Sequence, residues 1–200
     1  MTESSTASPT DLADLSSRLE FLRGIERLKS TLRSAHASNG RVESAAEHSW
    51  RLAMLAWATS DLLREQFPGL RFERLIKICL VHDLGEAIGG DVPAPEQRHE
   101  PERQERERRD LQTLIAPLPG LLRSEFLELW DEYHQLSSDE ARVARALDKV
   151  ETIAQHNQGA NPPDFDYVFN LRYGRGRTDA VDLARRLRAL LDEQTRELAG

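Results

Sequence analysis

The chain has 200 residues, which fits one domain with modest extensions. Its net charge of −7 and its pI of 5.4 disfavour partners that are nucleic-acid polymers, because their phosphates would be repelled. The single cysteine, Cys79, excludes an internal disulfide and a multi-cysteine zinc site, and it suits a reducing cytoplasm. No stretch reaches the roughly 18 apolar residues of a membrane span, and the N-terminus lacks the apolar core of a signal peptide. We therefore expect a cytoplasmic protein.

The first ten residues are polar and rich in Ser and Thr, which predicts a disordered tail over residues 1–10. From Asp11 onward, apolar residues recur at spacings of three and four, as on one face of a helix. They are Leu12, Leu15, Leu19, Leu22, Ile25 and Leu28. A loop containing Asn39-Gly40 is expected over residues 34–42.

Ser44 and Glu47 have the spacing of a capping box, in which a hydroxyl and a carboxylate satisfy the free N–H groups of a helix start. This pattern predicts a helix that runs to about Gln66. Its predicted core stripe consists of Trp50, Met54, Trp57 and Ala58.

A further helix is predicted from Phe72 to Gly89, where Gly89-Gly90 would end it and residues 91–95 would form a stiff loop. Its expected inward face consists of Phe72, Ile76, Cys79 and Leu80.

The second half of the chain also has helical patterns. Residues 96–110 are densely charged and predict an exposed helix that starts near Pro101. Amphipathic helices are expected over residues 121–136, after Ser138, and over residues 179–198; the one after Ser138 has the stripe Val143, Leu147, Val150 and Ile153. Residues 157–178 predict a loop with one short element. No strand pattern is visible, so the predicted fold is all-α: a single helical bundle with its core over 11–158, and 159–200 packed on the same domain.

One helix breaks its own pattern. His82, Asp83 and Glu86 stand where further apolar residues are expected on the face of the helix predicted over 72–89. At helical spacing the three side chains project over one patch, and burying them would be costly without compensation. A bound cation would offset that cost, so this patch predicts a metal site.

Two other residues are suited to complete the ligand set. His48 lies in the first turn of the helix that starts after Ser44, and Asp148 lies beside the apolar stripe of a later helix. Two imidazoles and two carboxylates form a mixed nitrogen and oxygen set, which suits one Mn²⁺, Fe²⁺, Co²⁺, Ni²⁺ or Zn²⁺ ion with positions left for water or phosphate.

The order of these residues resembles the signature of the HD-domain superfamily of metal-dependent phosphohydrolases. Three blocks carry the resemblance: ESAAEHS at 43–49, LVHDLGEAIGGDVPAP at 80–95 and LDKVE at 147–151. They are similar to the 5′-deoxynucleotidase-like branch, and the resemblance extends from about Phe21 to Asn157. Together the blocks are specific, although none of them would be alone.

The resemblance implies a role for each matching residue. The implied metal ligands are His48, His82, Asp83 and Asp148. Glu86 and Asp91 match acidic positions that handle water and the leaving-group proton, and Arg33 matches an arginine that contacts the substrate phosphate. In the bacterial nucleotidases a tryptophan follows that arginine, whereas this chain has Ser34, which leaves its sugar and base preference open.

The implied activity is hydrolysis of a nucleotide, foremost a (deoxy)nucleoside 5′-monophosphate, by a homodimer. Three alternatives stay open: a triphosphohydrolase, a cyclic-nucleotide phosphodiesterase and a non-catalytic nucleotide-binding HD module. Glu86 has the alternative role of only holding His82 in place. The remaining histidines, His36, His99, His134 and His156, lack a context that would make them ligands.

Overall fold

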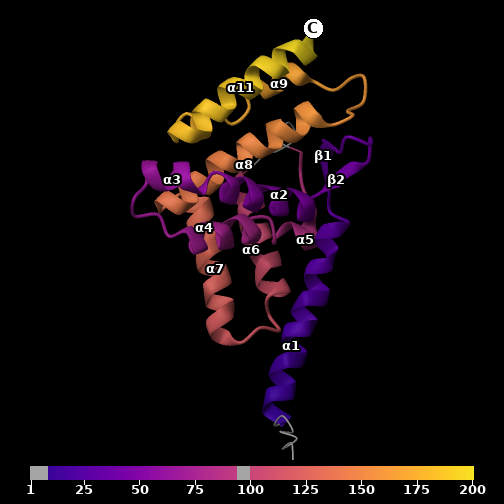
Figure 1. The fold of residues 1–200 in the computed structure, drawn as a ribbon. Coiled ribbons are helices and arrows are strands. Elements are labelled where there is room, and N and C mark those ends of the chain that lie inside the picture. Colours follow the sequence, from indigo (N-terminus) through magenta and orange to yellow (C-terminus); the bar gives the residue numbers. More distant parts are fainter. Residues whose placement is uncertain (1–8, 94–99) are drawn as a thin grey trace, which may run out of the picture.

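The structure is a computed structural model that describes residues 9–93 and 100–200. Most of the described chain is helical, so the prediction of an all-α protein is confirmed (Figure 1). The longer helices are α1 (Pro9–Ile25), α2 (Ala45–Ala58), α3 (Ser60–Gln66), α4 (Phe72–Val81), α6 (Glu100–Leu114), α7 (Gly120–Gln135), α8 (Asp139–Gln158) and α11 (Asp182–Ala199). The tail predicted over residues 1–10 lies mainly outside the described residues, as do Ala94, Pro95 and His99.

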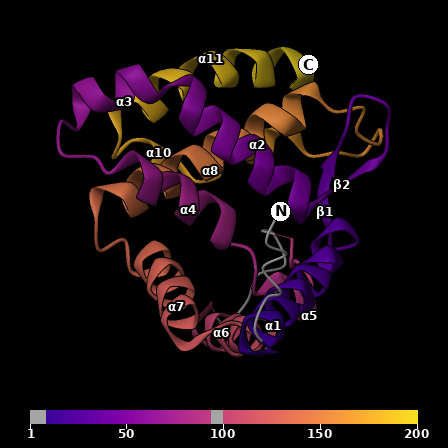
Figure 2. The same cartoon turned by 60° about the horizontal axis from the view of Figure 1, so that its bottom comes forward.

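Helix α8 forms the centre of the bundle. It lies between α11 on one side and α2 and α4 on the other (Figures 1 and 2), and all three pack against it. The predicted stripe of this helix is confirmed, because Val143, Leu147, Val150 and Ile153 are all buried. Ser138 caps the helix by accepting a hydrogen bond from the backbone N–H of Ala141, at 3.0 Å.

A small β-hairpin corrects the prediction of a loop over residues 34–42 and of no strand. Strands β1 (Leu32–His36) and β2 (Val42–Ser44) pair antiparallel, and Gly40 takes a positive φ of 81° in the turn between them. The strands are too short and too polar to produce an alternating apolar pattern, so only the Asn39-Gly40 signal was visible. The hairpin leads directly into α2 and carries Arg33.

The start of α2 is as predicted, but its length and its buried face are not. Ser44 and Glu47 form the capping box. The helix ends at Ala58 and α3 begins at Ser60, so the predicted helix to Gln66 is two helices. The core side of α2 consists of Ala45, Leu52 and Ala56, whereas Trp50, Met54 and Trp57 of the predicted stripe are exposed.

The helix predicted from Phe72 to Gly89 is also shorter. Helix α4 ends at Val81, a turn follows, and α5 (Glu86–Gly89) is a separate element that ends where Gly90 takes a positive φ of 79°. Of the predicted inward face of α4, Cys79 is buried, Phe72 and Ile76 are partly buried against the core, and only Leu80 is exposed. Leu75, Ile78 and Val81 complete the buried face. His82 and Asp83 therefore follow the end of a helix instead of lying within one.

The C-terminal region contains two short helices where one element was predicted, α9 (Tyr167–Asn170) and α10 (Arg175–Thr178). Both pack against α8 and α11. A 3₁₀ turn over Glu26–Lys29, labelled η1, follows α1 at the other end of the chain. Among the described residues, no helix is both long and apolar enough to cross a bilayer.

Candidate active site

Three separate elements bring the four predicted metal ligands together. His48 lies in the first turn of α2, His82 and Asp83 follow α4, and Asp148 lies on α8. The Nε2 atom of His48 is 3.2 Å from Oδ1 of Asp148 and 3.8 Å from Oδ2 of Asp83. The Nε2 atom of His82 is 3.1 Å from the same Asp83 oxygen. One atom from each ligand thus faces a common point between the three elements.

The two imidazoles have the orientation that a metal ligand requires. His82 donates from Nδ1 to the backbone carbonyl of Cys79 at 2.9 Å, which leaves the lone pair on Nε2. The Nε2 atoms of both His48 and His82 are buried and make no hydrogen bond with any described residue. Such unpartnered buried atoms are costly. A cation held by these two nitrogens and the carboxylates of Asp83 and Asp148 would satisfy all four groups, so the residues fit a divalent metal.

Glu151, which the sequence analysis did not single out, supports His48 from behind. Its Oε2 is 2.5 Å from Nδ1 of His48, and Arg51 contacts its Oε1 at 3.0 Å. Hydrogen bonding of a carboxylate to the far nitrogen of a ligating histidine fixes the ring and makes it a better ligand. Burial and Arg33 would lower the pKa of His48, but the neighbouring carboxylates of Asp148 and Glu151 outweigh them and raise it to about 9. The residue lies in the LDKVE motif, three positions after Asp148, so the motif itself was the available signal.

Carboxylates gather at two points around His48. Ligand atoms of His48, His82 and Asp83 lie within 4.8 Å of one another, and so do those of Glu43, His48 and Glu151. The second group is already neutralised, because Arg33 lies 3.6 Å from Glu43 and Arg51 pairs with Glu151. The first group, extended by Asp148, has the two unpartnered nitrogens. The first group is therefore the better metal site.

Asp148 is held by two further side chains. The hydroxyl of Tyr133 donates to its Oδ2 at 2.7 Å, and Nζ of Lys149 is 3.0 Å from the same oxygen. Burial opposes ionisation of Asp148, but Lys149 and His48 lower its pKa well below the ordinary value. Asp148 is therefore ionised, and its Oδ1, which lies nearest to His48, is left to face the ligand cluster.

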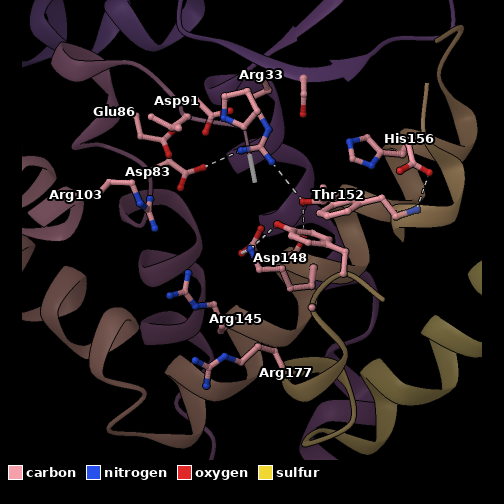
Figure 3. A pocket seen from close by; sticks show the side chains of 18 of the residues that line it. Arg33, Asp83, Glu86, Asp91, Arg103, Arg145, Asp148, Thr152, His156 and Arg177 are labelled. Atoms are coloured by element: carbon pink, nitrogen blue, oxygen red, sulfur yellow. Dashed lines mark hydrogen bonds and ion pairs between the residues drawn. The ribbon is translucent and has the colours of Figure 1, made fainter. Parts of the chain in front are cut away.

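Arg33 of β1 reaches the same place from the hairpin. Its Nη1 lies 3.4 Å from Oδ2 of Asp83, and its Nη2 lies 3.4 Å from the hydroxyl of Thr152 (Figure 3). Glu43 flanks its Nε at 3.6 Å. These contacts are long for charge-assisted hydrogen bonds, so the guanidinium keeps donor capacity for an anion.

The predicted proton-handling residues line the same cavity. Glu86 begins α5 and is buried, and its Oε2 has no hydrogen-bond partner among the described residues. Burial, followed by the charges of Asp83 and Asp91, raises the pKa of Glu86 well above its ordinary value. Burial also raises the pKa of Asp91, against the opposing charge of Arg33. Both carboxyl groups are therefore suited to carry a proton.

The cavity has a volume of about 800 Å³, and its lining includes Arg33, Asp83, Glu86, Asp91 and Asp148. Three further cations, Arg103, Arg145 and Arg177, line its wall. Figure 3 shows Arg145 and Arg177 on the side of Asp148 away from Arg33. Arg145 lies over the ring of Tyr133 at 4.4 Å. The rest of the lining is more aromatic and includes Phe165, Phe169 and Tyr173, and Ser34 lines the cavity beside Arg33.

The arrangement agrees with a family comparison. The sequence profile of the HD domain matches residues 25–188. The chain belongs to the HD-domain family. The predicted resemblance is thereby confirmed. It was predicted to extend from Phe21 to Asn157, and the profile match reaches further toward the C-terminus, to residue 188.

Curated relatives and solved structures agree with this family. The mouse protein 5′-deoxynucleotidase HDDC2 is 34% identical over 142 residues, which are 70% of this chain and 68% of the mouse protein. The 5′-deoxynucleotidase of Yersinia pestis is 34% identical over 131 residues, 63% of this chain and 66% of that protein. The crystal structure of a predicted metal-dependent phosphohydrolase from Magnetospirillum magnetotacticum is 28% identical, with a TM-score of 0.80 over 94% of this chain and 96% of that one.

Proposed function

We propose that this protein is a metal-dependent phosphomonoesterase that hydrolyses nucleoside 5′-monophosphates. The observation that carries the proposal is the pair of unpartnered Nε2 atoms of His48 and His82 beside two carboxylates, at the end of a cavity of about 800 Å³. The similarity to proteins named 5′-deoxynucleotidase supports a nucleotide as substrate.

The proposed cofactor is one divalent cation held by His48, His82, Asp83 and Asp148. The mixed nitrogen and oxygen donors suit Mn²⁺, Fe²⁺, Co²⁺, Ni²⁺ or Zn²⁺. When bound, such an ion polarises a phosphoryl oxygen and lowers the pKa of water at the site. The remaining steps depend on residues of the chain.

Arg33 is the proposed phosphate-binding residue. Its charge would balance the phosphate and the negative charge that builds up in the transition state. Arg145 is a second candidate that the sequence analysis did not identify, because nothing in its sequence context distinguishes it from other helix arginines. It lies one turn before Asp148, lines the cavity and makes no ion pair with a carboxylate of the described residues within 4.0 Å. A phosphate at the ligand cluster would be flanked by both cations (Figure 3).

Glu86 and Asp91 are the proposed proton carriers. A carboxyl group near the attacking water accepts its proton, and one near the ester oxygen protonates the leaving nucleoside. Glu86 is the first candidate, because its Oε2 is buried and unpartnered within the described residues while it lines the cavity. Asp91 lines the same wall and is the alternative.

The substrate is proposed to be small. A cavity of about 800 Å³ is of the size that holds a drug-sized ligand, and the net charge of −7 disfavours a nucleic-acid polymer. A nucleoside triphosphate, a cyclic nucleotide or binding without catalysis would be distinguished from this proposal by the products formed.

The test is a screen for phosphate release from nucleoside mono-, di-, tri- and cyclic phosphates with each of the five metals. We expect free phosphate and nucleoside from monophosphates. Glu86→Gln should lose about 10²–10⁴-fold in rate while it keeps its metal. The proposal would be contradicted if the main reaction were release of inorganic triphosphate from nucleoside triphosphates or ring opening of cyclic nucleotides. Nucleotide binding without turnover by the metal-loaded protein would also contradict it.

We also propose that the protein is a cytoplasmic homodimer. Helix α1 exposes Leu12, Leu15, Leu19 and Leu22, which are 52–58% accessible and share one helix face. A second copy of this chain would cover that face. Light scattering should give about twice the monomer mass for the wild-type protein, and Leu15→Glu with Leu19→Glu should give the monomer. A monomeric wild-type protein would contradict the dimer. The reduced, buried Cys79 supports the cytoplasm.

A further inference from the structure

One face of α8 leads from the ligand cluster toward the far end of the cavity. Asp148, Thr152 and His156 follow one another at intervals of four residues, and all three line the cavity. Since an α-helix rises about 1.5 Å per residue, His156 lies about 12 Å along the axis from Asp148. Thr152, in the middle, contacts the guanidinium of Arg33. This face is thus about as long as a nucleotide whose phosphate lies at the ligand cluster.

His156 has the properties of a binding residue rather than of a core histidine. It is only 6% exposed, and its Nδ1 is 2.9 Å from Oδ1 of Asn170. An amide oxygen only accepts, so Nδ1 carries the hydrogen and Nε2 has the free lone pair. Nε2 is buried and has no hydrogen-bond partner among the described residues. Burial lowers the pKa of His156, so the ring is neutral and Nε2 remains an acceptor at neutral pH.

The ring is also held in place. Phe165 packs edge-on against His156 with the ring centroids 5.0 Å apart, and Tyr167 packs edge-on against Phe165 at 4.8 Å. Asn170, on α9, fixes the other side of the imidazole. A histidine fixed by contacts on two sides presents its acceptor atom in one direction, which is what selective recognition requires.

The surroundings of His156 disfavour a phosphate and favour an uncharged group. Phe165 packs on His156, and its sequence neighbours Asp164, Asp166 and Phe169 also line the cavity. Two carboxylates repel a phosphate, whereas aromatic rings and hydrogen-bond acceptors suit a sugar and a base. Figure 3 shows His156 on the opposite side of the cavity from Glu86 and Arg103. The cavity therefore has a cationic end for phosphate and an acceptor-rich end for the nucleoside.

We propose that Nε2 of His156 accepts a hydrogen bond from an N–H or O–H donor of the nucleoside and so sets which nucleotides this protein prefers. The donor is either an exocyclic amine of the base or a hydroxyl of the sugar. This inference rests on the proposed function, because it takes the phosphate to be at the ligand cluster.

The test compares matched substrates within each variant. dCMP has an amine at C4 and a bare nitrogen acceptor at N3, whereas dUMP has a carbonyl oxygen at C4 and an N–H donor at N3. A 2′-deoxy and a 2′,3′-dideoxy monophosphate of the same base differ only in the 3′-hydroxyl. Each ratio of kcat/KM is measured for the wild-type protein, for His156→Phe, which keeps a ring against Phe165 but has no acceptor, and for His156→Gln, which offers an amide oxygen.

We expect His156→Phe to reduce one of the two ratios by roughly 2- to 12-fold, the range for one uncharged hydrogen bond, and His156→Gln to restore part of it. The ratio that changes identifies the donor as base or sugar. Because both members of each pair meet the same protein, a general loss of folded enzyme cancels. Two unchanged ratios, or an equal loss on all substrates, would overturn the proposal.

Binding provides a readout that does not depend on turnover. The same pairs are titrated calorimetrically into the metal-loaded Glu86→Gln protein, in which turnover is slowed, with and without His156→Phe, and the ratios of Kd are compared. A changed Kd ratio without turnover would support the role of His156 while contradicting the phosphomonoesterase. Turnover with unchanged Kd ratios would support the phosphomonoesterase while contradicting the role of His156. The failure of one proposal can therefore be told apart from the failure of the other.

Discussion

Two buried clusters of charge in this protein differ in how completely they are satisfied. In the first, Arg188 of α11 donates to Asp192 at 2.6 Å and to the backbone carbonyls of Tyr173 and Asn170, and Arg175 pairs with the other oxygen of Asp192 at 2.6 Å. No side-chain atom of Arg188 or Asp192 lacks a partner. In the second cluster, between α2, α4 and α8, the two imidazole Nε2 atoms of the proposed ligands have none.

The difference is the one expected between a structural cluster and the proposed metal site. Buried polar groups are nearly always hydrogen-bonded in folded proteins, so a cluster that satisfies itself needs nothing further. The Arg188 cluster fastens α11 to the segment that contains α9 and α10. The His48 and His82 cluster remains incomplete until a ligand supplies the missing contacts. We expect substitutions in the first cluster to affect folding and substitutions in the second to affect metal binding and catalysis.

The largest effect is expected at His82. His82→Ala removes one of four ligands, so the protein should lose its metal and its activity should fall to background. The fold should survive, because the residue follows the end of α4 and its Nε2 makes no hydrogen bond with a described residue. Elemental analysis, circular dichroism and phosphate release measure the three quantities. Wild-type metal content in the variant would refute the assignment of His82 as a ligand.

The matching change in the structural cluster is Arg188→Met. It leaves the carboxylate of Asp192 buried with one partner fewer, and breaking a buried ion pair in this way costs about 3–5 kcal/mol of the free energy of unfolding. Metal content per folded molecule should not change. Denaturant unfolding and elemental analysis provide the two measurements.

The control is the double variant Arg188→Met with Asp192→Leu. It removes both charges, so it should recover much of the lost stability. If Arg188→Met instead lost metal while remaining stable, the comparison between the two clusters would be wrong.

The sequence was sufficient to single out the four residues that the structure brings together, but not the local structure that positions them. His82 and Asp83 were visible because they interrupt an apolar helix face, and the order of motifs pointed to His48 and Asp148. The prediction of one helix from Phe72 to Gly89 was wrong, because the turn over residues 82–85 contains only one isolated glycine, Gly85, and a helical pattern tolerates an isolated glycine. The ligands converge by tertiary packing instead of by helical spacing.

Two kinds of residue escaped the sequence analysis for physical reasons. Glu151 hydrogen-bonds to His48 and Tyr133 hydrogen-bonds to Asp148, so each would act on the site only through another residue. Glu151 is far from His48 in sequence, and the spacing between Tyr133 and Asp148 is ordinary, so no sequence pattern marks either pair. Trp50 and Trp57 were predicted to be buried, since apolar residues at helical spacing normally face the core. Their exposure shows that a helix at the surface can have a second apolar face, which periodicity alone does not assign.

A smaller effect is expected at Glu151. Glu151→Gln keeps the shape of the side chain and an acceptor for Nδ1 of His48 but removes the charge, so metal affinity should fall by about 10–100-fold. Competition with a chelator of known affinity measures it. Glu140→Gln is a suitable control, because Glu140 pairs with Arg71 away from the ligands and its loss should leave metal affinity unchanged. An unchanged affinity in Glu151→Gln would mean that Glu151 only contributes to packing.

The smallest effect concerns Ser34, where the related bacterial nucleotidases have a tryptophan. Ser34 lines the cavity beside Arg33, and its short side chain leaves space there. An added 2′-hydroxyl therefore meets no wall, so kcat/KM for matched ribo and deoxy monophosphates should differ by less than about 10-fold. Ser34→Trp would fill that space, and an apolar wall rejects an added hydroxyl by up to about 10²-fold. The variant should therefore gain a preference for the deoxy substrate, mainly through a lower kcat/KM for the ribonucleotide. A strong deoxy preference already in the wild-type protein would show that another cavity residue acts as the wall.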